Sequence, residues 1–362
     1  MELYKIAAAN LIGIGKHRLS LLCKNLKGLH SLFNMDIEQL SSQCNANKNL
    51  LMKMKRKRAL QLAKKQLSFN ARYGIKTLFY TDKEYPEQLK ECADAPVVLY
   101  YKGVIPLNQP KIVSIVGTRK CSLYGKKIVQ EFIEQMKDQN ILVISGLAYG
   151  IDTCVHEYCM SNNVPTIGVL GHGHHMIYPK SNSSLAKKMC KNGGLLSEFG
   201  IHDGMSKYNF PKRNRIIAGI AHLTIVIESP IKGGSMITAN LANSYNREVM
   251  AFPGQVSSAY SQGCNELIKN HKAHLISGAE DVFSLMNWSK KDSNHNMQVE
   301  LNTHESLIVQ LLQSDHDIHF DHLIQKTEFS TSYLQSVILG LELKNILFEI
   351  PGFRFKLNPQ FL

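Results

Sequence analysis

Between residues 111 and 286, short apolar runs alternate with longer stretches whose apolar positions recur at helical spacing. A short apolar run is typical of a buried strand, and regular alternation with helical segments is typical of βαβ units. Such units form a largely parallel sheet that helices cover on both faces. The pattern therefore predicts an α/β fold with an extended Rossmann-like sheet. We place its strands at residues 112–116, 141–145, 165–170, 194–199, 223–228 and 248–252.

Two earlier segments, at residues 77–80 and 96–101, are rich in aromatic and β-branched residues. Such residues favour strands. The second segment leads directly toward the strand at 112–116, so we expect both to extend the same sheet. The sheet domain is accordingly placed at residues 73–288.

The regions that flank this domain have helical patterns. In residues 1–72, Gly13 and Gly15 interrupt a helical pattern, which indicates a helix-hairpin-helix unit in a small helical N-terminal domain. Such a hairpin can offer backbone N–H groups to a DNA phosphate, or it can simply turn tightly. The helix predicted to follow, ending near Ala71, contains the basic run 53–58, which is either a solvated face or a contact to a nucleic-acid backbone.

The end of the chain predicts a further domain. A polar stretch at residues 289–303 has the composition of a linker. In residues 304–362, three helical patterns precede two short strands joined by Pro351-Gly352, which predicts a C-terminal winged-helix domain. The third helix offers only Lys344 as a cation, so a protein contact or an internal regulatory role is favoured over reading a DNA groove. His316, His319 and His322 are interpreted as part of a polar helix entry rather than as metal ligands.

The stretch from Ile112 to Gly125 predicts a strand, a tight turn and a helix. Its turn, Gly117-Thr118-Arg119, combines backbone N–H groups, a helix N-terminus and an Arg side chain at the carboxyl edge of the sheet. That combination is suited to binding a phosphate. The turn alone leaves open whether the phosphate belongs to a mononucleotide, a dinucleotide or a nucleic acid.

Several other loops are predicted to lie at the same edge, because the carboxyl ends of parallel strands are on one side of a sheet. Each loop contains glycine or a cation, which by itself is ordinary turn chemistry. Their recurrence predicts an anion-binding edge. These loops include Ser145-Gly146, Tyr178-Pro179-Lys180, the segment 209–215 and Gly233-Gly234-Ser235.

Common cofactor and metal patterns are missing from the sequence. No G-x-x-x-x-G-K-[ST] motif occurs, and the segment that begins at Gly171 has Met176 where a dinucleotide fingerprint needs its third glycine. His172, His174 and His175 are interpreted as solvated loop residues. The eight cysteines form no C-x-x-C pair, which favours reduced thiols and no metal site. Asp152, Cys154 and His156 are interpreted as a helix start and packing residues.

The net charge of +13 is concentrated near the start of the chain. Residues 1–75 contain fourteen Lys and Arg against three Asp and Glu, whereas residues 301–362 contain four against seven. A basic segment of this kind suggests a nucleic-acid partner, although it also improves solubility. No secretory leader and no apolar run of membrane-spanning length is found, so we expect a cytoplasmic protein without a membrane partner.

Read in order, the loop motifs resemble the DNA-processing protein A (DprA/Smf) family of bacterial recombination mediators. The resemblance covers residues 75–285, and the flanking domains also fit the family. The matching segments are 116–119, Tyr124-Gly125, 145–152, Tyr178-Pro179, 196–199, 210–219, 234–239, Pro253-Gly254 and 263–265.

This resemblance implies a noncatalytic Rossmann-like protein without cofactor or metal. It would bind single-stranded DNA as a homodimer and load the RecA recombinase onto DNA that enters during natural transformation. Arg119 and Lys180 would be the principal phosphate contacts. Tyr149 departs from the family, which commonly has Arg there, and its ring could instead stack on a base. The remaining implied DNA contacts are Gly117, Thr118, Ser145, Gly146, Lys212, Arg213, Asn214, Arg215, Gly234 and Ser235.

Two alternatives come from other functional classes. A nucleotide-acting enzyme of the lysine-decarboxylase-like phosphoribohydrolase type would use a related core. It would need an acid or base at the strand ends, where Glu198 and Asp152 are the candidates. A protein-interaction adaptor would bind no DNA at any salt concentration.

Overall fold

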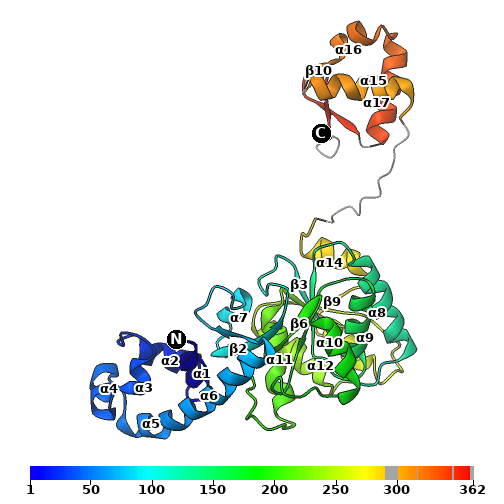
Figure 1. The fold of residues 1–362 in the computed structure, drawn as a ribbon. Helices are drawn as coiled ribbons and strands as arrows, with labels where there is room; N and C mark the ends of the chain where they lie inside the picture. Colours follow the sequence, from blue (N-terminus) through cyan, green and yellow to red (C-terminus); the bar gives the residue numbers. More distant parts are fainter. Residues whose placement is uncertain (290–300, 316, 345, 359–362) are drawn as a thin grey trace. The chain divides into compact units, whose positions relative to one another are not determined.

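The computed structural model describes residues 1–289, 301–315, 317–344 and 346–358 (Figure 1). The chain divides into two compact units, Met1–Lys290 and Lys291–Leu362. Most of the predicted linker at 289–303 lies outside the described residues. The helical segment that we expected as a separate domain belongs to the same unit as the sheet. Among the described residues, no helix combines the length and the apolar content needed to cross a membrane.

The first unit is built on a nine-stranded sheet in the order β1-β2-β6-β5-β4-β3-β7-β8-β9. Strands β3 to β9 pair in parallel, whereas β1 pairs antiparallel with β2 and β2 antiparallel with β6. The predicted α/β sheet and its extension by the two early strands are therefore confirmed, and the short strand β9 was missed. The strands are β1 (Lys76–Phe79), β2 (Val98–Gly103), β3 (Ile112–Val116), β4 (Leu142–Ser145), β5 (Thr166–Val169), β6 (Gly193–Ser197), β7 (Leu223–Val226), β8 (Glu248–Ala251) and β9 (His274–Leu275).

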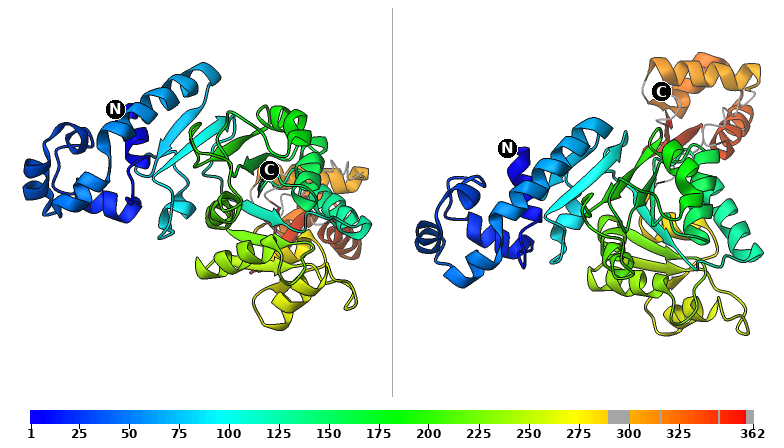
Figure 2. Two further views of the ribbon diagram at one scale, coloured as in Figure 1. Left: turned by 90° about the horizontal axis from the view of Figure 1, so that it is seen from below. Right: turned by 60° about the horizontal axis from the view of Figure 1, so that its bottom comes forward.

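Helices cover both faces of the sheet (Figure 2). Successive side chains of a strand point to opposite faces, so Ile112 and Val116 of β3 pack into one apolar core and Val113 and Ile115 into the other. The first core is completed mainly by α7 (Glu87–Glu91), α11 (Asn209–Ile220), α12 (Gly234–Ser244) and α13 (Gln262–Lys269). The second is completed mainly by α8 (Leu123–Gln135), α9 (Ile151–Ser161) and α14 (Ala279–Leu285), while η1 (Lys180–Asn182) and α10 (Ser183–Met189) follow β5.

The N-terminal helices form a third apolar core against β1 and β2. Gly13 has a left-handed φ of +74°, as the predicted tight turn requires. The Lys16 Nζ donates hydrogen bonds of 2.7 Å to the carbonyls of Lys90 and Cys92, so this hairpin is docked on the rest of the unit. The helices are α1 (Glu2–Ala9), α2 (Lys16–Cys23), α3 (Ser31–Asn34), α4 (Ile37–Cys44), α5 (Lys48–Lys53) and α6 (Arg56–Tyr73).

The basic run at 53–58 does not lie within one helix, which corrects our prediction. Lys55 has a left-handed φ of 51° and separates α5 from α6. Arg56 is partly buried and donates to the carbonyls of Leu32 and Met35, so it stabilises this region from within. Lys53, Lys55, Lys57 and Arg58 remain exposed.

The described residues of the second unit form three helices and a three-stranded sheet in the order β10-β12-β11. Its apolar core includes Ile308, Leu323, Leu334 and Leu357. His316 of the predicted polar helix entry lies outside the described residues. The elements are α15 (Thr303–Ser314), β10 (Ile318–His319), α16 (Phe320–Thr327), α17 (Thr331–Leu343), β11 (Leu347–Ile350) and β12 (Arg354–Leu357).

Candidate nucleic-acid interface

The predicted site loops meet where the chain reverses its direction across the sheet. From β3 the chain proceeds outward through β4, β5 and β6, and it then returns to β7 on the other side of β3. In open sheets of this type, ligands bind at the carboxyl ends of the strands near such a reversal. The loops that carry Arg119, Gly146 and Tyr178 line one small pocket there, together with Phe210 from the first turn of α11.

Arg119 is exposed at this edge and has an aromatic neighbour. Its guanidinium lies 5.6 Å from the centroid of the Phe210 ring. Tyr178 lies 5.8 Å from Phe210 and 6.4 Å from Tyr149, measured between ring centroids. Tyr149 and Tyr178 are 49% and 41% exposed. The structure thus places a cation beside three aromatic rings on an accessible surface.

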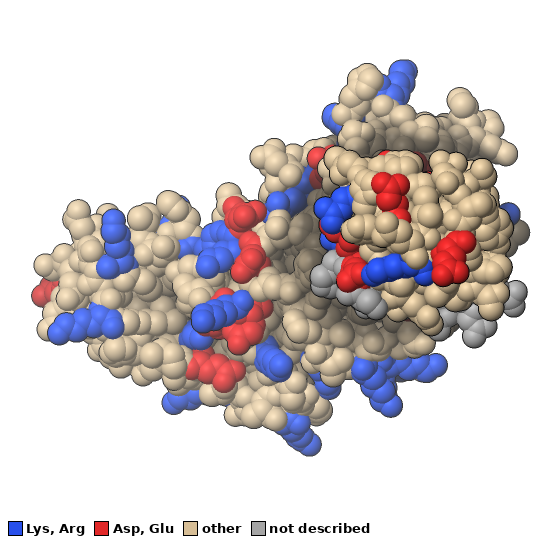
Figure 3. Space-filling view, turned by 90° about the horizontal axis from the view of Figure 1, so that it is seen from above, with Lys and Arg blue, Asp and Glu red and all other residues tan. Residues whose placement is uncertain are grey.

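Lys180 is the second exposed cation of the edge, at the start of η1 and directly after Tyr178-Pro179. Within the part of the chain that the structure describes, neither the Lys180 ammonium group nor the Arg119 guanidinium has a hydrogen bond or an ion pair. Both charges are therefore available to a phosphate. On the face drawn in Figure 3, acidic side chains are interspersed among the Lys and Arg of the first unit, so the basic residues form no continuous stripe on that side.

Arg213 is buried, which corrects its assignment as a direct DNA contact. Its guanidinium donates to the carbonyls of Gly146 and Val169. Asp152, also buried, is on the same side of Gly146, because a Cβ added there would lie 2.5 Å from Arg213 Nη2 and 2.6 Å from Asp152 Oδ2. Burial raises the pKa of Asp152 and lowers that of Arg213 to about 10, and each charge opposes the other's shift. Arg213 therefore links the carboxyl ends of β4 and β5 from inside the fold.

Arg215 and Lys212 are both paired with Glu198. Arg215 donates to a carboxylate oxygen of Glu198 and to the carbonyl of Asp94, and its side chain is only 11% exposed. The Lys212 Nζ lies 3.5 Å from the same oxygen, but its side chain is 55% exposed. Burial raises the pKa of Glu198, while the two cations oppose this shift. Of these two, Lys212 alone is placed to reach a DNA backbone.

The predicted glycine and hydroxyl contacts are mostly internal. A Cβ at Gly117 would lie 2.5 Å from the Ile151 side chain, so glycine is required there by the close approach of α9. The hydroxyls of Ser145 and Ser235 donate to the Ile115 carbonyl and to the Ser229 hydroxyl, and both residues are buried. Thr118 is also buried, and its hydroxyl accepts from the Lys120 N–H.

Gly234 is different because it is exposed and a Cβ there would meet no neighbour. Its carbonyl accepts a hydrogen bond of 3.3 Å from the Asn214 side-chain amide. Asn214 thus links the second turn of α11 to the start of α12.

The N-terminus of α8 is already occupied by a carboxylate that the sequence reasoning missed. Glu228, two residues after the end of β7, is 3% exposed and accepts from the Ser122 N–H at 3.0 Å and from the Ser122 hydroxyl at 2.5 Å. A phosphate at this helix end would be repelled by Glu228. The expectation that the N-terminus of α8 binds a phosphate is therefore wrong. In that turn, the group that remains available to an anion is the Arg119 side chain. The available signal was an acidic residue at the end of the predicted buried strand 223–228.

Two of the three loop histidines are structural, which corrects their interpretation as solvated. His172 is 1% exposed, and its ring nitrogens contact the Gly173 carbonyl at 3.0 Å and the Tyr178 N–H at 3.1 Å. His174 contacts the Tyr100 carbonyl at 2.9 Å, and burial lowers its pKa to about 4. His175 is exposed. Among the described residues, no three His, Cys, Asp or Glu side chains are grouped to hold a metal ion.

Comparisons with known proteins identify relatives of this chain. Residues 76–287 match the family model described as DNA recombination-mediator protein A. The chain is 39% identical to DNA processing protein DprA of Streptococcus pneumoniae over 203 residues, covering 56% of this chain and 71% of that protein. DprA of Bacillus subtilis is also 39% identical, over 58% of this chain and 71% of its own length.

Similar folds are also found among solved structures. The crystal structure of Streptococcus pneumoniae DprA aligns with a TM-score of 0.66 and 33% identity, covering 78% of this chain and 96% of that one. A structure that describes the single-stranded DNA binding mode of Helicobacter pylori DNA processing protein A aligns with a TM-score of 0.54 and 25% identity, covering 60% and 98%. With more than half of its length matched by the family model, the chain belongs to the DNA recombination-mediator protein A (DprA/Smf) family.

Proposed function

We propose that this protein binds single-stranded DNA at the carboxyl edge of its sheet and loads the RecA recombinase onto DNA that enters the cell in natural transformation. The observation that carries the DNA-binding part is the exposed Arg119 beside Phe210, with Tyr178 and Tyr149 next in line. Cations that meet phosphates and rings that stack on bases bind single strands without sequence preference. A duplex offers no unstacked bases to these rings.

The described contacts favour binding over nucleotide chemistry. A phosphoribohydrolase that uses the pocket containing Arg119 would need an acid or base within reach of a nucleotide bound there. Asp152 is buried near Arg213, and Glu198 is held between Arg215 and Lys212. Neither carboxylate is presented to the pocket that contains Arg119. DNA binding is also supported by the similarity to Helicobacter pylori DNA processing protein A, whose structure concerns its single-stranded DNA binding mode.

The homodimer, the cytoplasmic location and the RecA contact extend this proposal on the family resemblance. A recombination mediator works where chromosomal DNA and RecA are found. Sedimentation of the purified chain would show a species of twice the chain mass if the homodimer is correct.

A binding titration tests the DNA-binding part. Labelled 20-nucleotide single strands and the matching duplex are titrated at 50 and 200 mM salt. We expect tighter binding to the single strand, with an affinity that falls as salt rises by about 0.7 logarithmic unit per tenfold salt for each phosphate contact. Equal affinity for both DNA forms would contradict a single-strand site.

The loading part needs a second measurement. RecA filament assembly is followed on single strands that are covered by a single-strand-binding protein, with and without this chain. Faster assembly is expected, and an unchanged rate would leave a DNA-binding protein that does not load RecA.

A further inference from the structure

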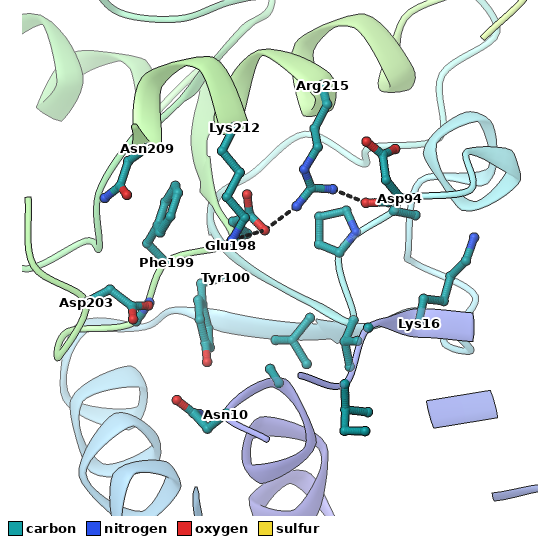
Figure 4. A pocket seen from close by; sticks show the side chains of 18 of the residues that line it. Asn10, Lys16, Asp94, Tyr100, Glu198, Phe199, Asp203, Asn209, Lys212 and Arg215 are labelled. Atoms are coloured by element: carbon teal, nitrogen blue, oxygen red, sulfur yellow. Dashed lines mark hydrogen bonds and ion pairs between the residues drawn. The ribbon is translucent and has the colours of Figure 1, made fainter. Parts of the chain in front are cut away.

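A cavity of about 560 Å³ lies in the first unit, between the N-terminal helices and the sheet. Figure 4 shows Glu198 between Lys212 and Arg215 on one side of it, with the Tyr100 ring and Asn10 on the other. Most of its lining is polar, and Pro96, Val97, Tyr100 and Phe199 supply the apolar part of its wall. A planar ring with a polar edge is the shape that such walls accommodate.

Among the described residues that line this cavity, Glu198 has a carboxylate oxygen without a hydrogen-bond partner. Both cations contact Glu198 Oε2, whereas Oε1 is buried and has no hydrogen-bond partner among the described residues. The whole side chain is only 8% exposed. A buried acceptor without a partner is costly, so this carboxylate is complementary to an N–H donor. The same residue lines the cavity, so a small shift of the carboxylate would bring this oxygen within reach of a donor bound there.

Lys212 gives the cavity a cation at its opening. Its ammonium group lies 3.5 Å from Glu198, and more than half of the side chain is exposed, so it has N–H donors left for a phosphate. Asn209 and Lys212 line this cavity, whereas Phe210 lines the pocket that contains Arg119. The first turn of α11 therefore separates two neighbouring concavities, each with a cation and an aromatic or apolar wall.

We propose that this cavity binds a single amino-bearing nucleobase, with Glu198 accepting from the exocyclic amine and Lys212 contacting the phosphate of the same nucleotide. A base of a bound strand and a free nucleotide share this chemistry. For a strand, the inference rests on the proposed single-stranded DNA binding. Enzymes that hold an unstacked base read its Watson–Crick edge in the same way.

The carboxylate distinguishes two pyrimidines of equal size. 5-Methylcytosine presents an amino group at C4, which donates to a carboxylate. Thymine presents a carbonyl there, and its N3–H is flanked by two carbonyl oxygens that a carboxylate repels. The two bases carry the same methyl group and the same phosphates, so any difference in affinity reports the hydrogen-bonding edge.

The experiment compares 20-nucleotide strands of 5-methyldeoxycytidine and of thymidine by fluorescence anisotropy. The wild type should bind the first at least about fivefold more tightly. In Glu198→Gln, the amide oxygen remains with Arg215 and Lys212 and the NH₂ group faces the cavity, so the ratio should fall to one or below. Equal wild-type affinities, or a ratio that Glu198→Gln leaves unchanged, would overturn the inference.

A second variant tests binding in the cavity without changing Glu198, so the test does not depend on the folding of Glu198→Gln. Gly204 lines the cavity, and a Cβ there would meet no neighbour, so the backbone at this position accepts a side chain and Gly204→Phe is designed to obstruct the cavity. This variant should also lose the preference, whereas Lys180→Ala should weaken both strands equally and keep the ratio. Retention of the full preference in a folded Gly204→Phe protein contradicts binding in this cavity.

Titration calorimetry with free 5-methyl-dCMP and dTMP separates the cavity from the proposed function. A preference for 5-methyl-dCMP that Glu198→Gln removes would support the base site, even if the protein binds no single strand. Absence of strand binding in that case would reject only the single-stranded DNA function. Strand binding without any preference in either assay would reject only the base site.

Discussion

Arg213 and Asp152 are buried together around the space that a side chain at Gly146 would occupy. The arginine also donates to two loop carbonyls, so this pair fixes the ends of β4 and β5 on which the site loops stand. A cation that looked like a phosphate ligand is thus a structural residue. A substitution of Arg213 should therefore lower stability, whereas a substitution of the exposed Arg119 should weaken DNA binding.

Arg213→Met should destabilise the protein by about 3–5 kcal/mol, because it removes the buried cation near Asp152 and the donors that serve two carbonyls. Urea unfolding of the purified protein measures this change. Arg119→Ala is the matched control, since its exposed side chain should change the free energy of unfolding by less than about 0.5 kcal/mol. Equal stabilities of the two variants would contradict the structural role of Arg213.

Arg119→Ala and Lys180→Ala should each weaken single-strand binding and lower the slope of log affinity against log salt by about 0.7, as expected for one lost phosphate contact. Affinities measured at four salt concentrations give the slopes. Lys187, exposed on α10 away from the strand ends, provides the control substitution Lys187→Ala. Wild-type slopes in both folded site variants would show that the strand runs elsewhere.

Tyr149 stands where the family commonly has arginine and is half-exposed beside Tyr178. Tyr149→Arg should increase the salt slope by about 0.7 because it adds a phosphate contact. Tyr149→Ala should weaken binding by about 1–3 kcal/mol without changing the slope, since it removes a stacking surface. The same anisotropy titrations measure both effects. If Tyr149→Ala binds like the wild type, the ring does not stack on a base.

His156 should make the protein less stable as the pH falls below about 6.5. It is buried, its Nδ1 lies 2.8 Å from the Thr166 hydroxyl, and burial lowers its pKa to about 3. The unfolded chain takes up a proton near pH 6.5 and the folded chain does not, so stability is present above the unfolded pKa and is lost below it. This residue should contribute a loss of about 2 kcal/mol between pH 7 and pH 5.

His156→Gln, which stays neutral, tests this expectation. Urea unfolding of both proteins at pH 7 and pH 5 should show a smaller loss for the variant. His174, whose pKa burial lowers to about 4, should still give the variant some pH dependence of the same sign. Identical losses in the two proteins would show that His156 is not buried in its neutral form.

Much of the sheet could be predicted from sequence because buried strands are continuous apolar runs. Ile112–Val116 was placed without error, and the other predicted core strands were placed within about two residues of their observed ends. The two-residue strand β9 gave no such run. The break at Lys55 was missed because a left-handed φ at a lysine has no local sequence signal.

The sequence by itself determined the fold class, the edge of the sheet at which loops gather, and the cations available there, because hydrophobic periodicity and chain order are local properties. Only the tertiary structure decided which cations are free. Arg119 and Lys180 are exposed, Arg213 is buried with Asp152, Arg215 is held by Glu198, and Glu228 occupies the end of α8. These differences arise from partners distant in the chain, and burial makes an unpaired charge too costly to leave without one.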